Sequence, residues 1–593
     1  MNWTQVIDPL SNLALSALLA SLPILFIFWA LILKKMKGYK ASLLTFLVSV
    51  AVATIMYGMP VRLALLSGLY GAMYGLFPIC WIILGAVFLF NITVKSGEFE
   101  IIKGFMASIT QDRRLQAILI AFSFGAFVEG ATGFGGPIAI SAAMLVGLGF
   151  NPLYAAGLCL IANTAPVAFG AIGTPILAAA KVSDLPEMAI SQLVGRTLPI
   201  LSVMVPLYLV VIMAGFKKSL EVLPAILVSG ITFAVFQWYT SNFLGPMLPD
   251  VIAGLASIVS ILLFLKFWKP KNIWRFKEEP LQIIENTTSY PASQIIIASS
   301  PFIVMTIIVI AWGFEPIKAA LNSIGSIQCN IPGLQNSILK PDGTPLLIKP
   351  FEFNFLSTPG TGLMVAALIS MPLIGMRFKE WIKIFFATLK QLRFPFITIA
   401  SVVGFAFVAN NSGISITIAM ALASTGALFP FFSPILGWLG VFLTGSDTSS
   451  NALFCKLQYN SAHVIGVDPV VTVSANASGG VTGKMISPQS IAIGSASVGL
   501  VGQESKLFRF TFKHSFIMLT VICVVTMLQA YAINWIVPRY KAVEAIIKTE
   551  TESLSRGFLY LLILAIVLVL ITASVFLLNR KKKALLSATV TSS

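Results

Sequence analysis

Charged residues are scarce in this chain, and so are the residues from which enzymes build most active sites. Only 10% of the 593 residues are charged, whereas soluble domains contain about 25% charged residues. The chain has two histidines, and its five cysteines follow no CxxC spacing, so we expect no metal site and no cofactor. The nucleotide-binding pattern GxxxxGK(S/T) is also missing. These absences argue against a soluble protein, an ATP-driven pump and an enzyme.

Long apolar runs occupy most of the sequence instead. Hydrophobic residues make up 57% of the chain, and runs such as 13–33, 251–268 and 558–578 are as long as a helix that crosses a membrane. The sequence therefore predicts an all-α polytopic membrane protein with about 12–14 transmembrane helices. The expected spans lie near residues 11–33, 41–59, 63–94, 152–180, 187–213, 221–243, 248–268, 294–314, 359–376, 394–410, 468–494, 514–537 and 558–579.

Basic residues gather in short loops between these runs. The formal net charge is +17, and positive clusters lie at 34–40, at 266–277 and in 580-RKKK-583. In a membrane protein this bias marks cytoplasmic loops and does not indicate nucleic-acid binding. It places the N-terminus outside and the C-terminus in the cytoplasm. The expected organisation is an N-terminal transmembrane repeat (1–270), a cytoplasmic linker (271–293), a C-terminal transmembrane repeat (294–579) with an extracytoplasmic loop (315–358), and a basic cytoplasmic tail (580–593).

The two halves share short motifs in the same order, which indicates a duplication. The pairs are Phe77-Pro78 with Phe394-Pro395, Ser96-Gly97 with Ser412-Gly413, Gly130 with Gly445, Asn151-Pro152 with Asp468-Pro469, and 162-ANTAPVAFGAIGTP-175 with 475-ANASGGVTGKMISP-488. The loop charges place Ser96-Gly97 inside and Ser412-Gly413 outside, so we expect inverted repeats. Many secondary transporters use this arrangement for alternating access, although channels can also contain it.

Glycine-rich segments interrupt the apolar pattern once in each half. The charges of the neighbouring loops require that each of the regions 115–150 and 434–462 starts and ends on the same side of the membrane. Each region is therefore predicted to be a re-entrant hairpin. Their tips are 129-EGATGFGGP-137 and 444-TGSDTSSNA-452. Unwound backbone at this depth must be buried in protein or line a wet cavity, and free helix ends there attract small anions. The candidate substrate-binding residues at the tips are Thr132, Gly133, Gly135, Gly136, Thr448, Ser449 and Asn451.

Each hairpin tip carries one carboxylate, Glu129 or Asp447. Because the two hairpins start from opposite faces, we expect these side chains to converge near the middle of the membrane. Intramembrane carboxylates are costly and commonly mark ion or proton paths. Both residues are therefore candidates for proton coupling. The alternatives are a structural ion pair and a cap on a helix N-terminus.

Several basic residues are also expected within or beside the spans. Arg196 either clamps a substrate carboxylate with its planar guanidinium or neutralises Glu129 or Asp447. Lys484 lies inside the second broken segment and is a candidate for substrate binding. Lys456 is interpreted as a flanking residue that extends to the membrane surface, and His463 as a polar residue at the end of a segment.

The paired segments 162–175 and 475–488 are predicted to be helices that unwind in the middle of the membrane. They would offer amide and hydroxyl groups opposite the hairpin tips. Their candidate substrate-binding residues are Asn163, Thr164, Thr174, Asn476 and Ser487. Close helix packing through small residues is the alternative explanation for these segments.

Two of these stretches resemble the signature regions of a known family, the bacterial L-lactate permeases. They are 125-GAFVEGATGFGGPIAISAAMLVGLGFNPLYAAGLCLIANTAPVAFGAIGTPI-176 and 444-TGSDTSSNALF-454. The resemblance covers most of the chain but not 315–358 or 541–556. It implies proton symport of short 2-hydroxymonocarboxylates, with L-lactate first and D-lactate and glycolate as relatives. It also implies an elevator-like ion-transporter architecture with paired re-entrant hairpins.

Together these observations predict a secondary active transporter that imports lactate with protons across the plasma (inner) membrane of a bacterium. Moving a lone lactate anion into a negative-inside cell costs about 2.3 kcal/mol per 100 mV, and a co-transported proton removes this cost. Sodium coupling, a different small carboxylate and a passive anion channel are the alternatives. The expected partners are the substrate (lactate or glycolate), protons and the lipid bilayer. A homodimer is an assembly that the sequence allows.

Overall fold

The structure is a computed structural model of the chain. It describes residues 3–34, 36–133, 136–276, 290–341, 343–346, 348–500 and 503–540, together with residues 560, 563 and 564. Within these residues the chain is mostly helical, with four short strands. All but three residues of the predicted span 558–579 lie outside this part of the chain, and so does the whole tail 580–593.

The first half of the chain, up to residue 267, contains one short strand and a series of helices. They are β1 (Trp3–Thr4), α1 (Leu13–Ala20), α2 (Leu22–Phe28), η1 (Trp29–Leu33), α3 (Gly38–Ile55), α4 (Val61–Tyr74), η2 (Gly75–Cys80), α5 (Trp81–Lys95), α6 (Glu98–Ser108), α7 (Arg113–Gln116), η3 (Ala117–Phe124), α8 (Gly125–Thr132), α9 (Gly136–Gly147), α10 (Pro152–Ala162), η4 (Val167–Phe169), α11 (Gly170–Ser183), α12 (Glu187–Thr197), α13 (Pro199–Ala214), α14 (Phe216–Leu220), α15 (Leu223–Phe243) and α16 (Pro249–Phe267).

The second half adds three strands and the remaining helices. They are α17 (Ala292–Gly313), α18 (Glu315–Gly325), β2 (Ser326–Cys329), β3 (Ile338–Leu339), β4 (Phe351–Asn354), α19 (Pro359–Leu373), α20 (Phe378–Ser412), α21 (Ile414–Ala423), η5 (Gly426–Leu428), α22 (Phe429–Thr444), α23 (Asp447–Ile465), α24 (Pro469–Lys484), α25 (Pro488–Ser497), α26 (Glu504–Tyr531) and η6 (Asn534–Ile536).

The predicted class, an all-α polytopic membrane protein, is confirmed. In the part of the chain that the structure describes, ten helices are long and apolar enough to cross a membrane, or up to eleven if the bent pair α10 and α11 counts as one span. The sequence predicts more spans because several apolar segments form helices too short for this count. The predicted span 11–33, for example, consists of three short pieces, and α19 has 15 residues.

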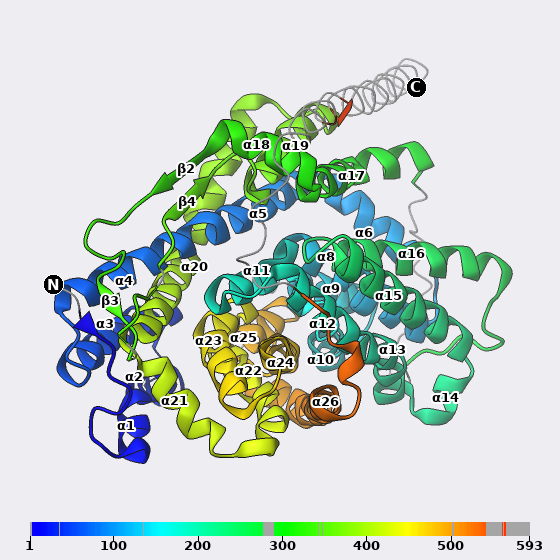
Figure 1. Cartoon of the computed structure of the whole chain (residues 1–593). Coiled ribbons are helices and arrows are strands. Elements are labelled where there is room, and N and C mark those ends of the chain that lie inside the picture. Colours follow the sequence, from blue (N-terminus) through cyan, green and yellow to red (C-terminus); the bar gives the residue numbers. More distant parts are fainter. Residues whose placement is uncertain are drawn as a thin grey trace.

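The helices are arranged around a central group (Figure 1). In that group α22 packs against α23, α24 and α26, while α12 packs against α24, and α11 packs against α23. On one side α20 packs against α3 and α4, and on the other α15 packs against α13 and α16. A buried apolar cluster joins residues of α9–α12 to residues of α24 and α26. Segments from both halves of the sequence therefore meet in the middle of the protein.

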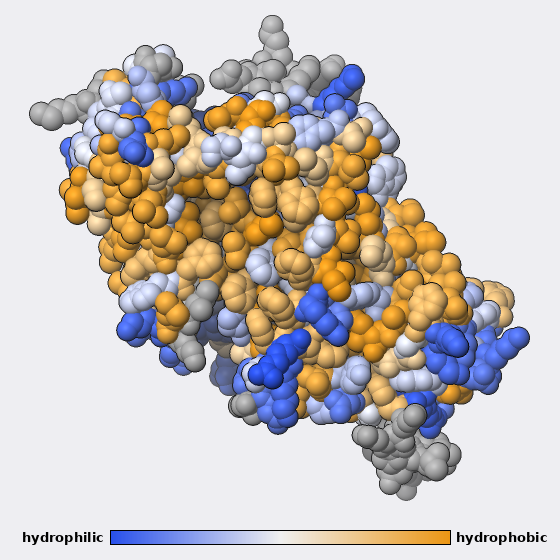
Figure 2. Space-filling model, turned by 90° about the horizontal axis from the view of Figure 1, so that it is seen from below, coloured by the Kyte–Doolittle hydropathy of each residue, from blue (hydrophilic) through white to orange (hydrophobic). Residues whose placement is uncertain are grey.

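The outer surface is largely apolar. Figure 2 shows hydrophobic side chains over most of one face, with most of the strongly hydrophilic ones toward its edges. Many large apolar side chains are exposed, among them Leu33, Ile55, Leu69, Phe243 and Phe267. Such a surface suits contact with lipid.

The N-terminal segment lies beside the loop that was predicted to be extracytoplasmic. β1 pairs with β3 in parallel register, and β2 pairs with β4 in antiparallel register. The Gln5 side chain donates to the backbone carbonyls of Asn410 and Asn411. The N-terminus, the loop 315–358 and the end of α20 thus lie together, and the side of the membrane that they face stays a prediction.

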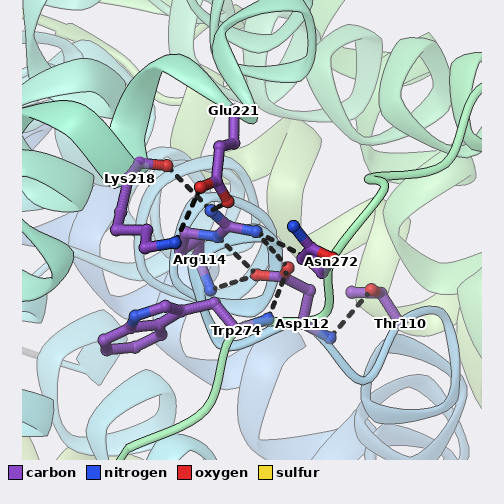
Figure 3. Close-up of polar contacts among 7 residues, drawn as sticks. All are labelled: Thr110, Asp112, Arg114, Lys218, Glu221, Asn272 and Trp274. Atoms are coloured by element: carbon purple, nitrogen blue, oxygen red, sulfur yellow. Dashed lines mark hydrogen bonds and ion pairs between the residues drawn. The ribbon is translucent and has the colours of Figure 1, made fainter.

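Several loops that were predicted to be cytoplasmic meet in a polar network around Arg114 (Figure 3). Its side chain is fully buried and forms ion pairs of 2.7 Å with Asp112 and 2.8 Å with Glu221. It also donates to the carbonyls of Lys218 and Asn272. This network fixes the start of α7 to the α14–α15 turn and to the segment after α16.

Paired motifs of the two halves have similar local structure. Gly97 and Gly413 each follow a long helix with positive φ, 83° and 94°. Asn151 and Asp468 each cap the next helix, because the side chain accepts the N–H two residues later and proline follows directly. These likenesses support the duplication. The inversion of the two repeats stays a prediction.

Candidate functional site

Two glycines terminate the helices that lead into the predicted hairpin tips. α8 is followed by Gly133 with φ of 62°, and α22 is followed by Gly445 with φ of 69°. Side chains with a Cβ rarely adopt this conformation. After the second turn, the Ser446 hydroxyl accepts from the Ser449 N–H and caps α23. Each tip is therefore a turn between two helices that pack on each other; Gly135 lies outside the described residues.

The predicted interruption of 162–175 is confirmed. α10 ends at Ala162, and the helix that follows the break is bent from it by 65°. Within the break Ala171, Ile172 and Gly173 have φ of 46°, 56° and 70°. A left-handed conformation costs about 1–2 kcal/mol for a residue with a Cβ. Such strain persists only where the surrounding structure imposes it, which is common at binding sites.

The predicted interruption of 475–488 is mostly wrong. α24 is helical from Pro469 to Lys484, and the chain leaves the helical conformation only at 485–487. The physical reason is close packing, since a Cβ added at Gly479 would collide with the carbonyl of Pro434 on α22. The small residues of this segment therefore bring two helices together, which is the alternative that the sequence left open.

The centre of the site is a buried ion pair between the two halves of the chain. The ammonium of Lys484, at the end of α24, lies 2.7 Å from Oε1 of Glu129 on α8. The two side chains are 7% and 1% exposed. Gly170, at the start of α11, makes room for the carboxylate, because a Cβ there would lie 2.7 Å from the same oxygen. A charge-assisted hydrogen bond of this length in a dry interior is strong.

Asp447 lies in the same enclosed region, in the first turn of α23. It is buried and close enough to Lys484 and Glu129 to interact with both electrostatically. Its Oδ2 is 3.5 Å from the Asn451 amide nitrogen. A Cβ at Gly480 would collide with its Oδ1. The two predicted carboxylates thus lie near each other, with the predicted Lys484 beside them.

Amide side chains connect the second hairpin to the end of the break in the first half. The Asn451 amide donates to the carbonyl of Pro175 at 3.0 Å, and the Asn476 amide donates to Asn451 Oδ1 at 2.9 Å. The hydroxyls of Thr174 and Thr448 are 3.4 Å apart. Four of the predicted site residues are therefore in one contact network, although Asn476 lies in a continuous helix.

A third buried carboxylate, Asp250, was missed at the level of sequence. It lies in the first turn of α16, is 1% exposed and is close enough to Glu129 and Lys484 to interact with their charges. The Gln237 amide nitrogen is 3.5 Å from its Oδ1. In the sequence it follows Pro249 at the start of an apolar run, which is typical of a residue at the membrane surface. An acidic residue within the predicted span 248–268, near its start, was the only signal.

Several polar atoms around this centre are buried without a hydrogen-bond partner in the described part of the chain. Native proteins leave few such atoms, and each calls for an explanation such as a bound ion, proton or ligand. They include Glu129 Oε2, Asp447 Oδ1, Asp250 Oδ2 and Ser449 Oγ, and both amide atoms of Asn163, at the end of α10, are likewise buried without a partner. The site thus has hydrogen-bond acceptors and donors that are not used.

Other predicted residues make only local contacts. The Thr132 hydroxyl donates to the Val128 carbonyl, and the Thr164 hydroxyl donates to the Ile161 carbonyl. The Ser487 hydroxyl caps α25, where it accepts from the Ser490 N–H. A Cβ at Gly136 would lie 3.0 Å from Thr132 Oγ1, so this glycine keeps the first tip compact. These residues shape the backbone near the site.

Arg196 does not belong to this centre, which corrects the sequence-based expectation. Its Nε donates to Asn242 Oδ1 at 2.9 Å, and its NH1 donates to the carbonyl of Ile536. It joins α12 to the end of α15 and to η6, while Lys484 neutralises Glu129. The reason is its position, since the face of α12 that carries Arg196 turns toward the end of α15.

The two residues interpreted as peripheral are peripheral in the structure. Lys456 pairs with Asp184 at 2.8 Å, where the Asp184 side chain is 68% exposed. His463 is exposed and lies against the ring of Tyr459. Neither makes a contact with the buried ion pair.

The solved structures that resemble this chain include two transporters of low sequence identity. Neisseria gonorrhoeae MtrF, described as illuminating a class of antimetabolite efflux pumps, is 14% identical with a TM-score of 0.41, over 76% of this chain and 81% of that one. The Alcanivorax borkumensis YdaH transporter is 13% identical with a TM-score of 0.42, over 79% of this chain and 89% of that one.

Comparison of sequences gives much higher similarity. The family described as L-lactate permease matches residues 16–533. The L-lactate permease of Bacillus subtilis is 53% identical over 91% of this chain and 100% of its own length. The L-lactate permease and the glycolate permease GlcA of Escherichia coli K12 are each 50% identical over 90% of this chain, and over 100% and 98% of their own lengths. The chain therefore belongs to the L-lactate permease family, and it is a multi-pass transporter of the bacterial inner membrane, not an enzyme.

Proposed function

We propose that this chain imports L-lactate, and also D-lactate and glycolate, by symport with protons. The names of relatives at about half identity support the substrate class. The observation that carries the coupling is the buried pair of Lys484 and Glu129, with two further carboxylates close to it.

Charge balance links the substrate to protons. Glu129, Asp447 and Asp250 can carry three negative charges, while Lys484 carries one positive charge. A monocarboxylate that enters this buried site adds another negative charge. Unpaired charges in a dry interior are very costly, and a carboxyl group avoids the cost by binding a proton. Binding of the anion and binding of protons therefore favour each other.

Lys484 provides the direct link between the two events. In this structure its ammonium is bound to Glu129. A proton on Glu129 removes the negative charge that holds the ammonium, so Lys484 becomes free to bind the carboxylate of the substrate. Release of the proton on the other side restores the ion pair and displaces the anion. The same lysine thus alternates between Glu129 and the substrate.

The 2-hydroxyl group of the substrate needs one donor and one acceptor. Ser449 in the first turn of α23 and Asn163 at the end of α10 are both buried with unpartnered polar atoms. The first turn of α23 also lies at the positive end of the helix dipole, which favours an anion. We assign Ser449, Thr448 and Asn163 to substrate recognition on this basis.

Alternating access follows from the same arrangement. We infer that the repeats 1–270 and 294–579 are inverted and that the helices carrying the site move as a unit, as in an elevator carrier. The N-terminus faces outward and the C-terminus faces the cytoplasm. The support is that the N-terminus lies beside the loop 315–358, whereas the basic loops meet around Arg114. A homodimer is the assembly that we propose for this carrier.

Uptake of labelled lactate into proteoliposomes tests the function. Gradients of pH, sodium and voltage are imposed one at a time on the purified full-length protein. An inwardly directed proton gradient should drive lactate above equilibrium, and a sodium gradient at constant pH should not. Accumulation with sodium alone would assign the coupling to sodium. Lactate flux that only equilibrates would indicate a passive anion channel.

A further inference from the structure

Asp250 is a buried carboxylate at the contact between the first hairpin and α16. Gly130, next to Glu129 on α8, packs against it so closely that a Cβ on this glycine would lie 2.8 Å from the Asp250 Cβ. The Asp250 side chain is 1% exposed, and its Oδ2 has no partner among the described residues.

A structural role as a helix cap does not account for Asp250. An acidic residue in the first turn of a helix is stabilised by the helix dipole, typically by about 0.3–1 kcal/mol at an exposed site. Desolvation of an ionised carboxylate costs much more than that unless it is paired or fully hydrogen-bonded. Asp250 has one long contact of 3.5 Å to Gln237.

Gln237 places Asp250 in a polar chain that reaches the break between α10 and α11. Its amide nitrogen donates to the carbonyl of Ala165 at 3.0 Å, and its Oε1 accepts from the Ser202 hydroxyl at 2.7 Å. Gln237 therefore holds the unwound backbone and the carboxylate with the same side chain. The position of Asp250 is thus tied to the segment that shapes the site.

We propose that Asp250 is a proton-binding residue of the transport site, occupied by a proton when the substrate anion is bound. The charged groups that face it are Glu129 on α8 and Lys484 on α24, while α15 contributes the neutral Gln237. Lys484 can neutralise one negative charge at a time, so a bound monocarboxylate leaves Glu129, Asp447 and Asp250 in need of protons. Asp250 takes its proton from the water on one side of the membrane and releases it to the water on the other.

This inference rests on the proposed function, and its test separates the two. Wild-type protein, Asp250→Asn and Asp250→Glu are reconstituted, with Asp184→Asn as the matched control, because Asp184 is an exposed aspartate whose partner is Lys456. Three quantities are measured: lactate accumulation driven by a proton gradient, lactate–lactate exchange without a pH gradient, and the apparent affinity for external lactate as a function of pH. If wild-type protein shows no proton-driven accumulation, the proposed function fails whatever the variants do.

Each proton that must bind together with lactate changes the apparent affinity for lactate with pH. The affinity falls by about tenfold for each unit that the pH rises, in the range where the site releases that proton. Asparagine has the shape of a protonated aspartate, so Asp250→Asn should keep lactate exchange. Its apparent affinity for lactate should depend on pH less steeply than that of the wild type, by one factor of about ten per pH unit. Asp184→Asn should behave as wild type. If Asp250→Asn keeps the full wild-type pH dependence, the inference is overturned.

The glutamate variant decides the case in which Asp250→Asn does not exchange lactate. A need for a titratable carboxyl predicts that Asp250→Glu restores exchange and the wild-type number of proton steps. A role in packing alone predicts that the longer glutamate is tolerated worse than the isosteric asparagine. Loss of exchange in both variants would therefore also overturn the inference.

Discussion

The ammonium of Lys484 lies 2.7 Å from a carboxylate oxygen of Glu129, although the two residues are 355 positions apart in the sequence. Lys484 ends α24 in the second half of the chain, and Glu129 lies on α8 at the first hairpin. This contact joins the two halves beside the break between α10 and α11, since Gly170 at the start of α11 lies against the same carboxylate.

Glu129→Gln should uncouple lactate from protons. Glutamine cannot hold the ammonium as a charge partner, so Lys484 becomes available to lactate without prior protonation. We expect lactate exchange to continue while proton-driven accumulation is lost, measured with labelled lactate in proteoliposomes. Normal proton-driven accumulation by this variant would contradict the role of Glu129 in coupling.

Lys484→Met should be harmful to both folding and binding. Removal of one partner of a buried ion pair typically costs about 3–5 kcal/mol, because the other charge stays buried alone. The variant should unfold at a lower temperature in detergent and should not bind lactate. The double variant with Glu129→Gln should regain most of the thermal stability but not the binding, which separates the structural effect from the functional one. Equal lactate binding in Lys484→Met would contradict the assignment.

The kinds of residue at the site were predictable from the sequence, whereas the pairing of cations with carboxylates was not. Glu129 and Asp447 stand out because carboxylates are rare in apolar segments, and the glycine-rich tips mark the turns at Gly133 and Gly445. Which cation neutralises Glu129 depends on how the two halves pack, and sequence spacing carries no such information. From spacing alone, Arg196 is as good a candidate as Lys484 for the cation that neutralises Glu129. The contact of Arg196 with Asn242 distinguishes the two.

The break in the first half and the continuous helix in the second show a further limit. Both 162–175 and 475–488 are rich in small residues and contain a late proline. Small residues permit either unwound backbone or close helix packing, and only the neighbouring helix decides between them. α22 lies directly against α24 at Gly479, so the second segment stays helical.

Arg196→Lys should lower stability without changing lactate affinity. The guanidinium binds Asn242 and the Ile536 carbonyl with two different nitrogens, and a lysine ammonium cannot reproduce this fork. We expect a lower unfolding temperature and an unchanged KM for lactate. A weaker affinity at unchanged stability would return Arg196 to the substrate site.

Glu221→Gln should change the acid sensitivity of the protein. Hydrogen bonds from Lys218 and then from Arg114 lower the pKa of the Glu221 carboxyl below its usual value. A lowered pKa in the folded state means that the contact stabilises the protein above the unfolded pKa of about 4.3. That stability is lost as the pH falls through the folded pKa. Thermal unfolding measured across this range should show a stability gap between wild type and Glu221→Gln at neutral pH that closes at acid pH.

Salt and a surface control sharpen this test. Glu221 is partly exposed, so the gap should shrink at high ionic strength. Glu100→Gln is the matched control, because Glu100 forms an exposed pair with Lys103 within one helix, and such pairs contribute little. If Glu221→Gln and Glu100→Gln lose equal thermal stability relative to the wild type, the buried Arg114 network contributes no more stability than a surface ion pair.

Cysteines at Thr174 and Thr448 should report movement between the break and the second hairpin. The two hydroxyl oxygens are 3.4 Å apart, so cysteines at these positions lie within reach of a disulfide. In a background without the five native cysteines, mild oxidation should cross-link the pair, stop lactate transport and leave the protein folded. Reduction should restore transport, and each single-cysteine variant should be unaffected by the oxidant. The expectation rests on the second hairpin opening away from α11 to admit lactate, which is a local movement within the unit of helices that carries the site. If the cross-linked protein transports lactate at the normal rate, the two elements move together, and the motion that exposes the site must lie elsewhere.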